Sequence, residues 1–128
     1  MRILLDTCTF LWLAGGGRPL PPRVVELYRA PETEVFLSAA SAWEIAVKCA
    51  SGRLFLPEPP DRFIPEERDN RSIHSLAIDE ESAFHVTRLP RLHRDPFDRM
   101  LVSQAIVHGL TLVTPDPLIT QYPARTLW

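Results

Sequence analysis

Four acidic residues have the types and positions to form one catalytic site. They are Asp6, Glu44, Asp98 and Asp116. Three of them stand where an apolar strand gives way to a helix or turn, or in the first turn of a helix, and parallel sheets assemble their sites at the carboxyl ends of strands. Carboxylates held close together raise one another's pKa, so they stay ionised only beside a cation. The pattern predicts a site for a hard divalent metal such as Mg²⁺ or Mn²⁺.

Each acid also has a purely structural interpretation. Asp6 and Asp116 have the positions of a helix N-cap or a turn residue. Asp95 and Asp98 have the spacing of an N-cap and the third helical residue, and we assign Asp95 to capping. Asp98 would then face a helix N-terminus, where free amides and the helix dipole favour negative charge. The four acids are more specific together than singly.

Glu44 has the strongest structural alternative. Lys48 follows it by four residues, a spacing that forms a weak ion pair of a few tenths of a kcal/mol on an exposed helix, so about 0.3 kcal/mol is at stake. The neighbouring residues are mostly alanine and other apolar types, which leaves little polar face for a solvated glutamate. This surrounding favours a functional Glu44.

Other chemistries lack their motifs. The four histidines, His74, His85, His93 and His108, show no metal-ligand spacing among themselves, and no HExxH motif or Cys/His cluster occurs, so zinc is disfavoured. The chain has no GxGxxG, no phosphate-binding P-loop and no GxSxG nucleophile motif. Oxygen-ligand chemistry is what remains.

A basic cluster precedes and enters the helix of Asp98. It consists of Arg88, Arg91, His93, Arg94 and Arg99. Such a cluster is by default a solvated face of the protein. Beside a metal site it could instead hold a phosphate backbone, and Arg94 and Arg99 are the candidates for substrate contacts.

Size and composition predict one ordinary globular domain over residues 1–128. The chain is 45% hydrophobic and 23% charged, with a net charge of −2, which argues against holding nucleic acid by bulk electrostatics alone. No apolar run approaches the roughly 20 residues of a membrane span, and no export signal is evident. We therefore expect a cytoplasmic protein in which Cys8 and Cys49 are free thiols, each packed as a small hydrophobe.

The hydrophobic pattern alternates strands and helices. We expect strands at 2–5, 35–37, 75–78, 110–114 and 125–128, and helices at 7–13, 21–30, 38–52, 79–90 and 95–109. Residues 53–71 are rich in proline and charge, and we assign them to a surface excursion with at most one short helix. Continuous apolar strands between helices predict an α/β fold with a parallel sheet covered on both faces.

Four segments together resemble the PIN-domain ribonucleases, and most closely the VapC-type toxins of type II toxin-antitoxin systems. The segments are Leu4–Thr7, Ser38–Ala46, His93–Leu101 and Leu112–Asp116. They occur in the family's order over nearly the whole chain, and the string HRDPFDRML is specific to one branch of it.

The resemblance implies a three-layer α/β/α sandwich (PIN-like) with a four- or five-stranded parallel sheet. It further implies that Asp6, Glu44, Asp98 and Asp116 bind Mg²⁺ or Mn²⁺ and that the protein cleaves RNA. Metal-activated water would be the nucleophile, so no protein nucleophile is required. Thr7 and Thr114 match hydroxyl residues of the family that hold the carboxylates or contact phosphate.

The resemblance also implies partners, namely a second copy of the chain and a cognate antitoxin protein that wraps the groove between the early helices. The candidate apolar residues for these surfaces are Phe10, Leu11, Trp12, Leu13, Val24, Val25, Leu27 and Tyr28. About half of them must be core, because one face of each helix is buried.

Two residues depart from the family pattern. Cys8 stands where relatives often have His or Asn, and Pro115 stands where many have Ala or Arg. Neither change removes an acid. Cys8 puts in doubt a substrate contact at that position, and Pro115 stiffens the loop that aims Asp116.

Two alternatives to a nuclease remain. One is a catalytically inert PIN-fold module that binds antitoxin or RNA, against which the four retained acids argue. The other is a receiver-like phosphoacceptor domain, which needs a lysine on a loop near the acids. The single lysine, Lys48, lies within the helix of Glu44 and argues against the receiver.

Overall fold

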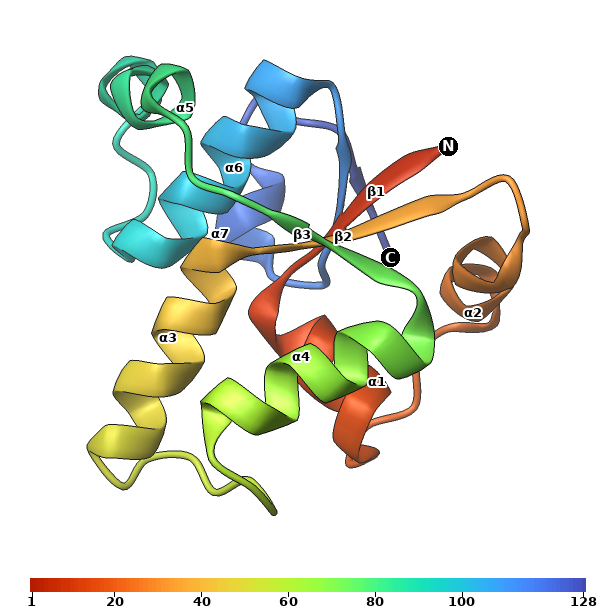
Figure 1. Cartoon of the computed structure of the whole chain (residues 1–128). Coiled ribbons are helices and arrows are strands. Elements are labelled where there is room, and N and C mark those ends of the chain that lie inside the picture. Colours follow the sequence, from red (N-terminus) through yellow and green to blue (C-terminus); the bar gives the residue numbers. More distant parts are fainter.

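A fully parallel five-stranded sheet runs through the molecule in the order β3-β2-β1-β4-β5 (Figure 1). The computed structural model describes all of residues 1–128. The strands are β1 (Arg2–Leu5), β2 (Glu34–Ser38), β3 (Ile73–Leu76), β4 (Thr111–Val113) and β5 (Thr126–Leu127). The predicted α/β/α sandwich with a parallel sheet is confirmed.

Seven α-helices surround the sheet. They are α1 (Thr7–Gly15), α2 (Pro22–Arg29), α3 (Ala39–Ala50), α4 (Pro60–Arg71), α5 (Glu80–His85), α6 (Pro96–His108) and α7 (Pro117–Thr120), with a 3-10 turn, η1 (Val86–Arg88), after α5. Helices α1, α2 and α4 lie on one side of the sheet, and α6 and α7 lie on the other (Figure 1). None of these helices combines the length and apolar character needed to span a membrane.

The central strand β1 is buried on both faces and divides the core in two. Ile3 and Leu5 point to the side of α1, α2 and α4, whereas Leu4 points to the side of α6 and α7. This alternation follows from the two-residue period of a strand. Because both faces are covered, the strand carries three consecutive apolar residues, and its carboxyl end delivers Asp6 to the sheet edge.

Three predicted acids also begin helices. Asp6 caps α1 by accepting a hydrogen bond from the Thr9 amide at 2.7 Å, and Asp116 caps α7 in the same way with the Leu118 amide at 2.9 Å. Asp95 caps α6, as predicted. The structural and functional interpretations of these acids are therefore compatible, because one helix cap does not occupy the whole carboxylate.

The expectation for residues 53–71 was wrong in part: the one helix that it allowed is present, but it is not short and it packs on the core. Helix α4 has 12 residues and buries Phe63 and Ile64 against the core on the side of α1. Pro60 occupies the first helical position, where its missing amide costs nothing, and Pro65 is tolerated within the helix. The number of prolines obscured a helix that is held by this apolar pair.

The third strand begins two residues earlier than expected, at Ile73 rather than at 75. Helix α4 ends at Arg71, and its C-cap Ser72 adopts a left-handed conformation with φ 55°, from which the chain enters the sheet directly. Ile73 is buried in the core, while the expected strand residue Ile78 is exposed.

Buried Ser38 and Gln104 connect the end of β2 to α6. The Ser38 hydroxyl donates to Gln104 Oε1 and also caps α3, the helix of Glu44, while Gln104 Nε2 donates to the Ala77 carbonyl at 3.1 Å. Both side chains are fully buried.

We expect Ser38→Ala to lower the free energy of unfolding by about 1–3 kcal/mol, because it leaves Gln104 Oε1 unpaired and removes a cap. Urea denaturation measures this loss. Equal stability of the variant and wild type would contradict it.

Candidate active site

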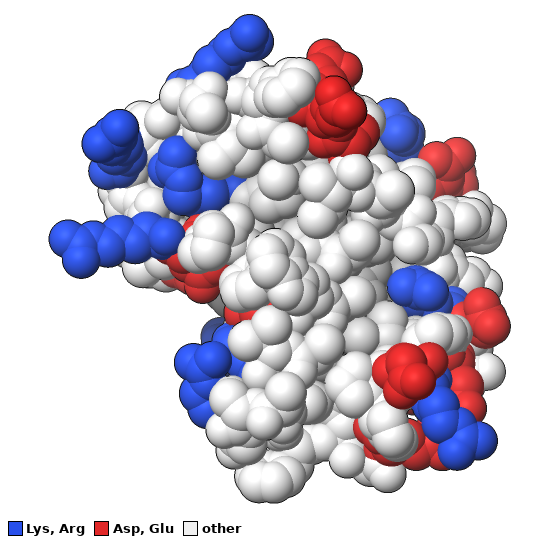
Figure 2. All heavy atoms as spheres, turned by 60° about the vertical axis from the view of Figure 1, so that its left-hand side comes forward, with Lys and Arg blue, Asp and Glu red and all other residues white.

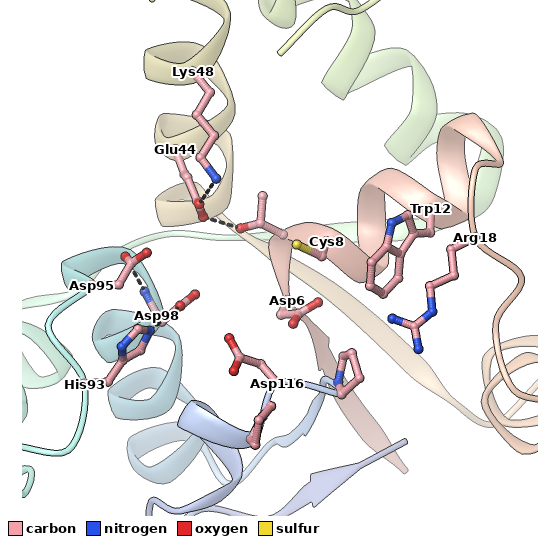
Figure 3. Close-up of a pocket in the computed structure, with 13 residues that line it drawn as sticks. Asp6, Cys8, Trp12, Arg18, Glu44, Lys48, His93, Asp95, Asp98 and Asp116 are labelled. Atoms are coloured by element: carbon pink, nitrogen blue, oxygen red, sulfur yellow. Dashed lines mark hydrogen bonds and ion pairs between the residues drawn. The ribbon is translucent and has the colours of Figure 1, made fainter. Parts of the chain in front are cut away.

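A cavity of about 530 Å³ opens at the carboxyl edge of the sheet (Figure 3). Its walls come from both halves of the chain and include all four predicted acids. The lining residues are Asp6, Thr7, Cys8, Trp12, Arg18, Glu44, Lys48, His93, Asp95, Asp98, Pro115, Asp116 and Pro117. Parallel topology produces this meeting, since β1, β2 and β4 all end at the same edge.

Asp6 lies deepest of the aspartates, with only 4% of the residue exposed. Burial raises the pKa of its carboxyl group, and the nearby carboxylate of Asp116 raises it further. Hydrogen bonds from Thr114 and Thr9 act in the opposite direction and lower this pKa. Thr114 also accepts from the amide of Asp116 at 3.1 Å, so its hydroxyl contacts both acids.

Asp98, in the first turn of α6, forms a close pair with His93, which lies in the loop that precedes this helix. The distance from His93 Nε2 to Asp98 Oδ2 is 2.8 Å, and both side chains are largely buried. Burial raises the pKa of Asp98 to about 6, although the hydrogen bond from His93 lowers it. The carboxylates of Asp95 and Glu44 add to the rise. Asp98 is therefore a carboxylate that gains from an added cation.

The histidine of this pair was not among the predicted site residues. Sequence reasoning placed His93 in the basic cluster, because the four histidines have no mutual metal spacing. In the structure, its ring nitrogen and the carboxylates of Asp98 and Asp116 lie within 4.8 Å of one another. The sequence did carry a signal for His93. It lies five residues before Asp98, and the cap Asp95 with Pro96 starts α6 between them, so the loop of His93 can fold back onto the first turn of that helix.

The donor set fits a hard divalent cation. Ligand atoms of Asp98, Asp116 and His93 lie within 4.8 Å of one another, and Asp6 lies beside them with its pKa raised by burial and by Asp116 (Figure 3). Carboxylate oxygens are the ligands that suit Mg²⁺ or Mn²⁺, and since His93 is already paired with Asp98 at 2.8 Å, the acids are the donors that fit such an ion. Two carboxyl groups with raised pKa values indicate electrostatic stress that a bound cation relieves.

Glu44 faces the cavity from α3 with both oxygens engaged. Thr7 donates to Oε1 at 2.7 Å, and Lys48 Nζ lies 2.8 Å from Oε2. The i,i+4 ion pair thus forms as expected, yet Glu44 is only 5% exposed and the pair lies at the site rather than in solvent. Hydrogen bonding to Glu44 raises the pKa of Lys48. Direct coordination by Glu44 requires Lys48 to release Oε2.

Thr7, the first residue of α1, connects that helix to α3 at the site. Its hydroxyl contacts Ser41 Oγ at 3.0 Å as well as Glu44, and all three residues are buried.

We expect Thr7→Val to reduce catalytic turnover about 10–100-fold, the usual cost of removing a group that orients a metal ligand. Thr87→Val is the matched control, because Thr87 is exposed and donates only to the Phe84 carbonyl. Equal turnover of the two variants would show that Thr7 does not orient Glu44 for catalysis.

The two arginines predicted as substrate contacts have different surroundings. Arg99 donates to the carbonyls of Val86 and Pro90 and to the Tyr122 hydroxyl, each at 3.0 Å, so it holds the loop that carries His93. Arg94 is exposed and lies outside the acidic cavity. It lines a neighbouring hollow with Arg91, Leu92, His93 and Arg99. This hollow joins the cavity at His93, which lines both.

A Ser, His and Asp cluster elsewhere in the fold is structural. Asp79 caps α5 and accepts hydrogen bonds from Ser82 Oγ at 2.7 Å and His108 Nε2 at 2.9 Å. These hydrogen bonds, above all the one from His108, hold the pKa of Asp79 well below its usual range. Ser82 is completely buried, so it has no access to a substrate. The cluster ties α5 to the end of α6.

Both cysteines are free thiols, as predicted. Cys49 packs against the core, but Cys8 is exposed and lines the cavity, which corrects the expectation that it is packed. Although the residue is exposed, the cavity wall partly desolvates its thiol, and this desolvation together with the nearby Asp6 raises the pKa of Cys8, which disfavours a thiolate there.

Comparison with known proteins agrees with this arrangement. A family profile described as the PIN domain matches residues 3–124, and the chain belongs to this family. Ribonuclease VapC16 of Mycobacterium tuberculosis is 37% identical over 51 residues. That match covers 40% of this chain and 36% of the relative, so it spans little more than a third of that protein.

Solved structures share the fold at low sequence identity. VapBC2 from Rickettsia felis, bound to a DNA fragment from its promoter, has a TM-score of 0.73 at 15% identity, over 99% of this chain and 98% of that chain. FitAcB from Neisseria gonorrhoeae has a TM-score of 0.62 at 21% identity, over 100% of this chain and 97% of that chain. These similarities confirm the PIN-like sandwich.

Proposed function

We propose that this protein is a metal-dependent endoribonuclease that acts as the toxin of a type II toxin-antitoxin system. The observation that carries the proposal is the convergence of Asp98, Asp116 and His93, with Asp6 beside them, in one cavity. Membership of the PIN family and the similarity to a relative named a ribonuclease support RNA as substrate. We further propose that the protein acts in the cytoplasm, where it would meet its RNA substrate.

The residues of the cavity would divide the work. Asp6, Asp98 and Asp116 would hold Mg²⁺ or Mn²⁺, with Glu44 as the fourth acid and His93 as a partner of Asp98. When bound, the ion supplies a water of lowered pKa and stabilises charge on the scissile phosphate. Thr7 and Thr114 would keep Glu44 and Asp6 in place, and Asp95 would fix the start of α6 beneath Asp98.

The basic rim would position the RNA backbone. Figure 2 shows Lys and Arg side chains on both sides of a notch at the left edge of the molecule, with acidic side chains between them. Arg91 and Arg94 line the hollow that adjoins His93, and neither forms an ion pair with an acidic residue. Arginine binds phosphate through paired hydrogen bonds, so this hollow suits the strand that enters the site.

A cognate antitoxin is the proposed protein partner. Several similar solved structures are toxin-antitoxin assemblies, among them the complex from Klebsiella pneumoniae. Of the predicted apolar set, Phe10 and Val24 are fully buried in the core, and Leu11, Leu13, Leu27 and Tyr28 are partly buried against it. Trp12, Leu13, Val25 and Tyr28 also line an open groove between α1 and α2. We propose this groove as the antitoxin surface.

A homodimer is the proposed assembly. Its support lies outside the predicted apolar set, in a mostly apolar hollow that Trp43, Ile78 and Phe97 line, where the Trp43 and Ile78 side chains are exposed. The centre of the face in Figure 2 is free of charged side chains. Light scattering tests this assembly. A dimeric mass that Trp43→Lys converts to a monomeric mass supports it, and a monomeric wild type contradicts it.

RNA cleavage tests the proposed function. Purified protein is incubated with structured RNAs in Mg²⁺ or Mn²⁺, and again after addition of a chelator. We expect cleavage that requires the metal and ceases with chelation. Cleavage without metal would contradict the mechanism, and RNA binding without cleavage under any metal would favour the inert PIN-fold module.

A further inference from the structure

We infer that Arg18 binds a backbone phosphate of the substrate on the side of the cavity opposite His93 and Asp98. This inference rests on the proposed ribonuclease function and extends it to the path of the RNA. The family resemblance did not assign a role to this residue. Its support is the place of the guanidinium, its freedom from acidic partners and the rings that hold it.

Arg18 is delivered to the cavity by the turn after α1. Gly16 and Gly17 have positive φ angles of 79° and 84°, which glycine adopts without strain because it has no Cβ. This turn reverses the chain, so the Arg18 side chain returns along Trp12 toward the site. In Figure 3, its guanidinium points into the cavity from the right, while His93 and Asp98 stand on the left and Asp6 lies between.

Two indole rings hold the guanidinium in place. Its central carbon lies 4.8 Å from the Trp12 ring centroid and 5.5 Å from that of Trp128. The two rings also pack edge to face, with centroids 5.8 Å apart. Cation–π contacts fix the side chain without using its N–H donors.

Arg18 is the basic residue of the cavity that has no anionic partner. Lys48 is paired with Glu44, and His93 is paired with Asp98. The Arg18 guanidinium makes neither a hydrogen bond nor an ion pair, and the residue's one hydrogen bond runs from its backbone amide to the Gly16 carbonyl at 2.9 Å, although the side chain shares a cavity with five acids. Its five donors are therefore available to an anion that a substrate brings, and phosphate matches the fork of a guanidinium.

Basic residues on two opposite sides of the cavity define a path for RNA across the acids that are proposed to bind the metal. Arg91 and Arg94 stand beyond His93 in the neighbouring hollow, and Arg18 stands on the far side of Asp6. A single strand that crosses from one side to the other places an intervening phosphate over the acids. A backbone contact of this kind positions the strand without reading its sequence.

The test compares Arg18→Gln, Arg18→Lys and the control Arg23→Gln in RNA binding and cleavage. Arg23 is exposed on α2 and lies outside the cavity. For Arg18→Gln we expect KM to rise about tenfold with kcat nearly unchanged, since a ground-state binding contact is lost. The slope of log K against log salt should fall by about 0.7, the value of one single-strand phosphate contact. Arg18→Lys should keep the slope, and Arg23→Gln should match wild type.

Three results separate the possible failures. If wild type cleaves RNA and Arg18→Gln has the KM and salt slope of Arg23→Gln, the phosphate contact is absent. If Arg18→Gln and Arg18→Lys lose thermal stability together without a change of slope, the residue only packs against the two tryptophans, and the inference is overturned. If wild type neither binds nor cleaves RNA with Mg²⁺ or Mn²⁺, the ribonuclease function itself fails, and the inference fails with it.

Discussion

Replacing Asp98 with asparagine is expected to lower the RNA cleavage rate at least about 100-fold and at the same time to stabilise the metal-free fold. The loss of activity follows because even a residue that only orients a metal ligand costs about 10–100-fold, and Asp98 is proposed as a ligand. The gain in stability follows because the carboxylate is desolvated and its pKa is raised to about 6. Asparagine keeps an oxygen for His93 and removes the charge.

At pH 7.5 we expect the metal-free Asp98→Asn protein to be more stable than wild type by roughly 1–3 kcal/mol, the order of magnitude that this pKa shift represents. Chemical denaturation in a chelator measures the stability, and single-turnover cleavage measures the rate. Asp69→Asn is the matched control, because Asp69 is exposed on α4 and does not line the cavity. Undiminished cleavage by Asp98→Asn would exclude Asp98 as a ligand.

The stability that a divalent metal adds is expected to grow with pH through about 6. Folded Asp98 has a pKa of about 6, above the value near 4 of an unfolded aspartate. Between these values the native state holds a proton that the unfolded state has released. The contribution of Asp98 to stability is therefore complete below about pH 4 and is lost as pH rises through about 6. The pKa of Asp6 is raised as well, so it acts in the same direction.

Metal binding reverses this loss, because the ion needs deprotonated carboxylates and displaces their protons. At about 100 times its dissociation constant, a ligand adds about 2.7 kcal/mol to the free energy of unfolding. Thermal unfolding with and without Mg²⁺ at pH 5.0 and pH 7.5 measures the effect. We expect a rise in Tm at pH 7.5 and little or none at pH 5.0. Equal shifts at both values would show that the ion binds elsewhere.

The sheet and most helices could be predicted because their signals are local. Asp6, Asp95 and Asp116 combine a capping carboxylate with a following helix, and Gly109 ends α6 in a left-handed conformation. Continuous apolar strands require cover on both faces. The full length of helix α4 escaped prediction because only Phe63 and Ile64 carry its apolar face, and four prolines in and before it suggested a loop.

The candidate acids could be predicted, but their partners could not. The contacts of Thr7 with Glu44 and of Ser38 with Gln104 join residues 37 and 66 positions apart, which no local pattern shows. His93 and Arg18 reach the cavity through loop geometry, and Arg99 lines the hollow of Arg94 while its guanidinium donates to the carbonyls of Val86 and Pro90 and to Tyr122. Ligation by the four acids stays a prediction.

Anomalous diffraction from a crystal soaked in Mn²⁺ at pH 7.5 tests most directly whether the acids hold a metal. We predict a peak in the cavity at bonding distance from carboxylate oxygens of Asp98 and Asp116, with Asp6 beside it, and no such peak in a crystal of Asp98→Asn. A cavity without a peak while Mn²⁺ is bound elsewhere on the protein would contradict the metal-dependent mechanism.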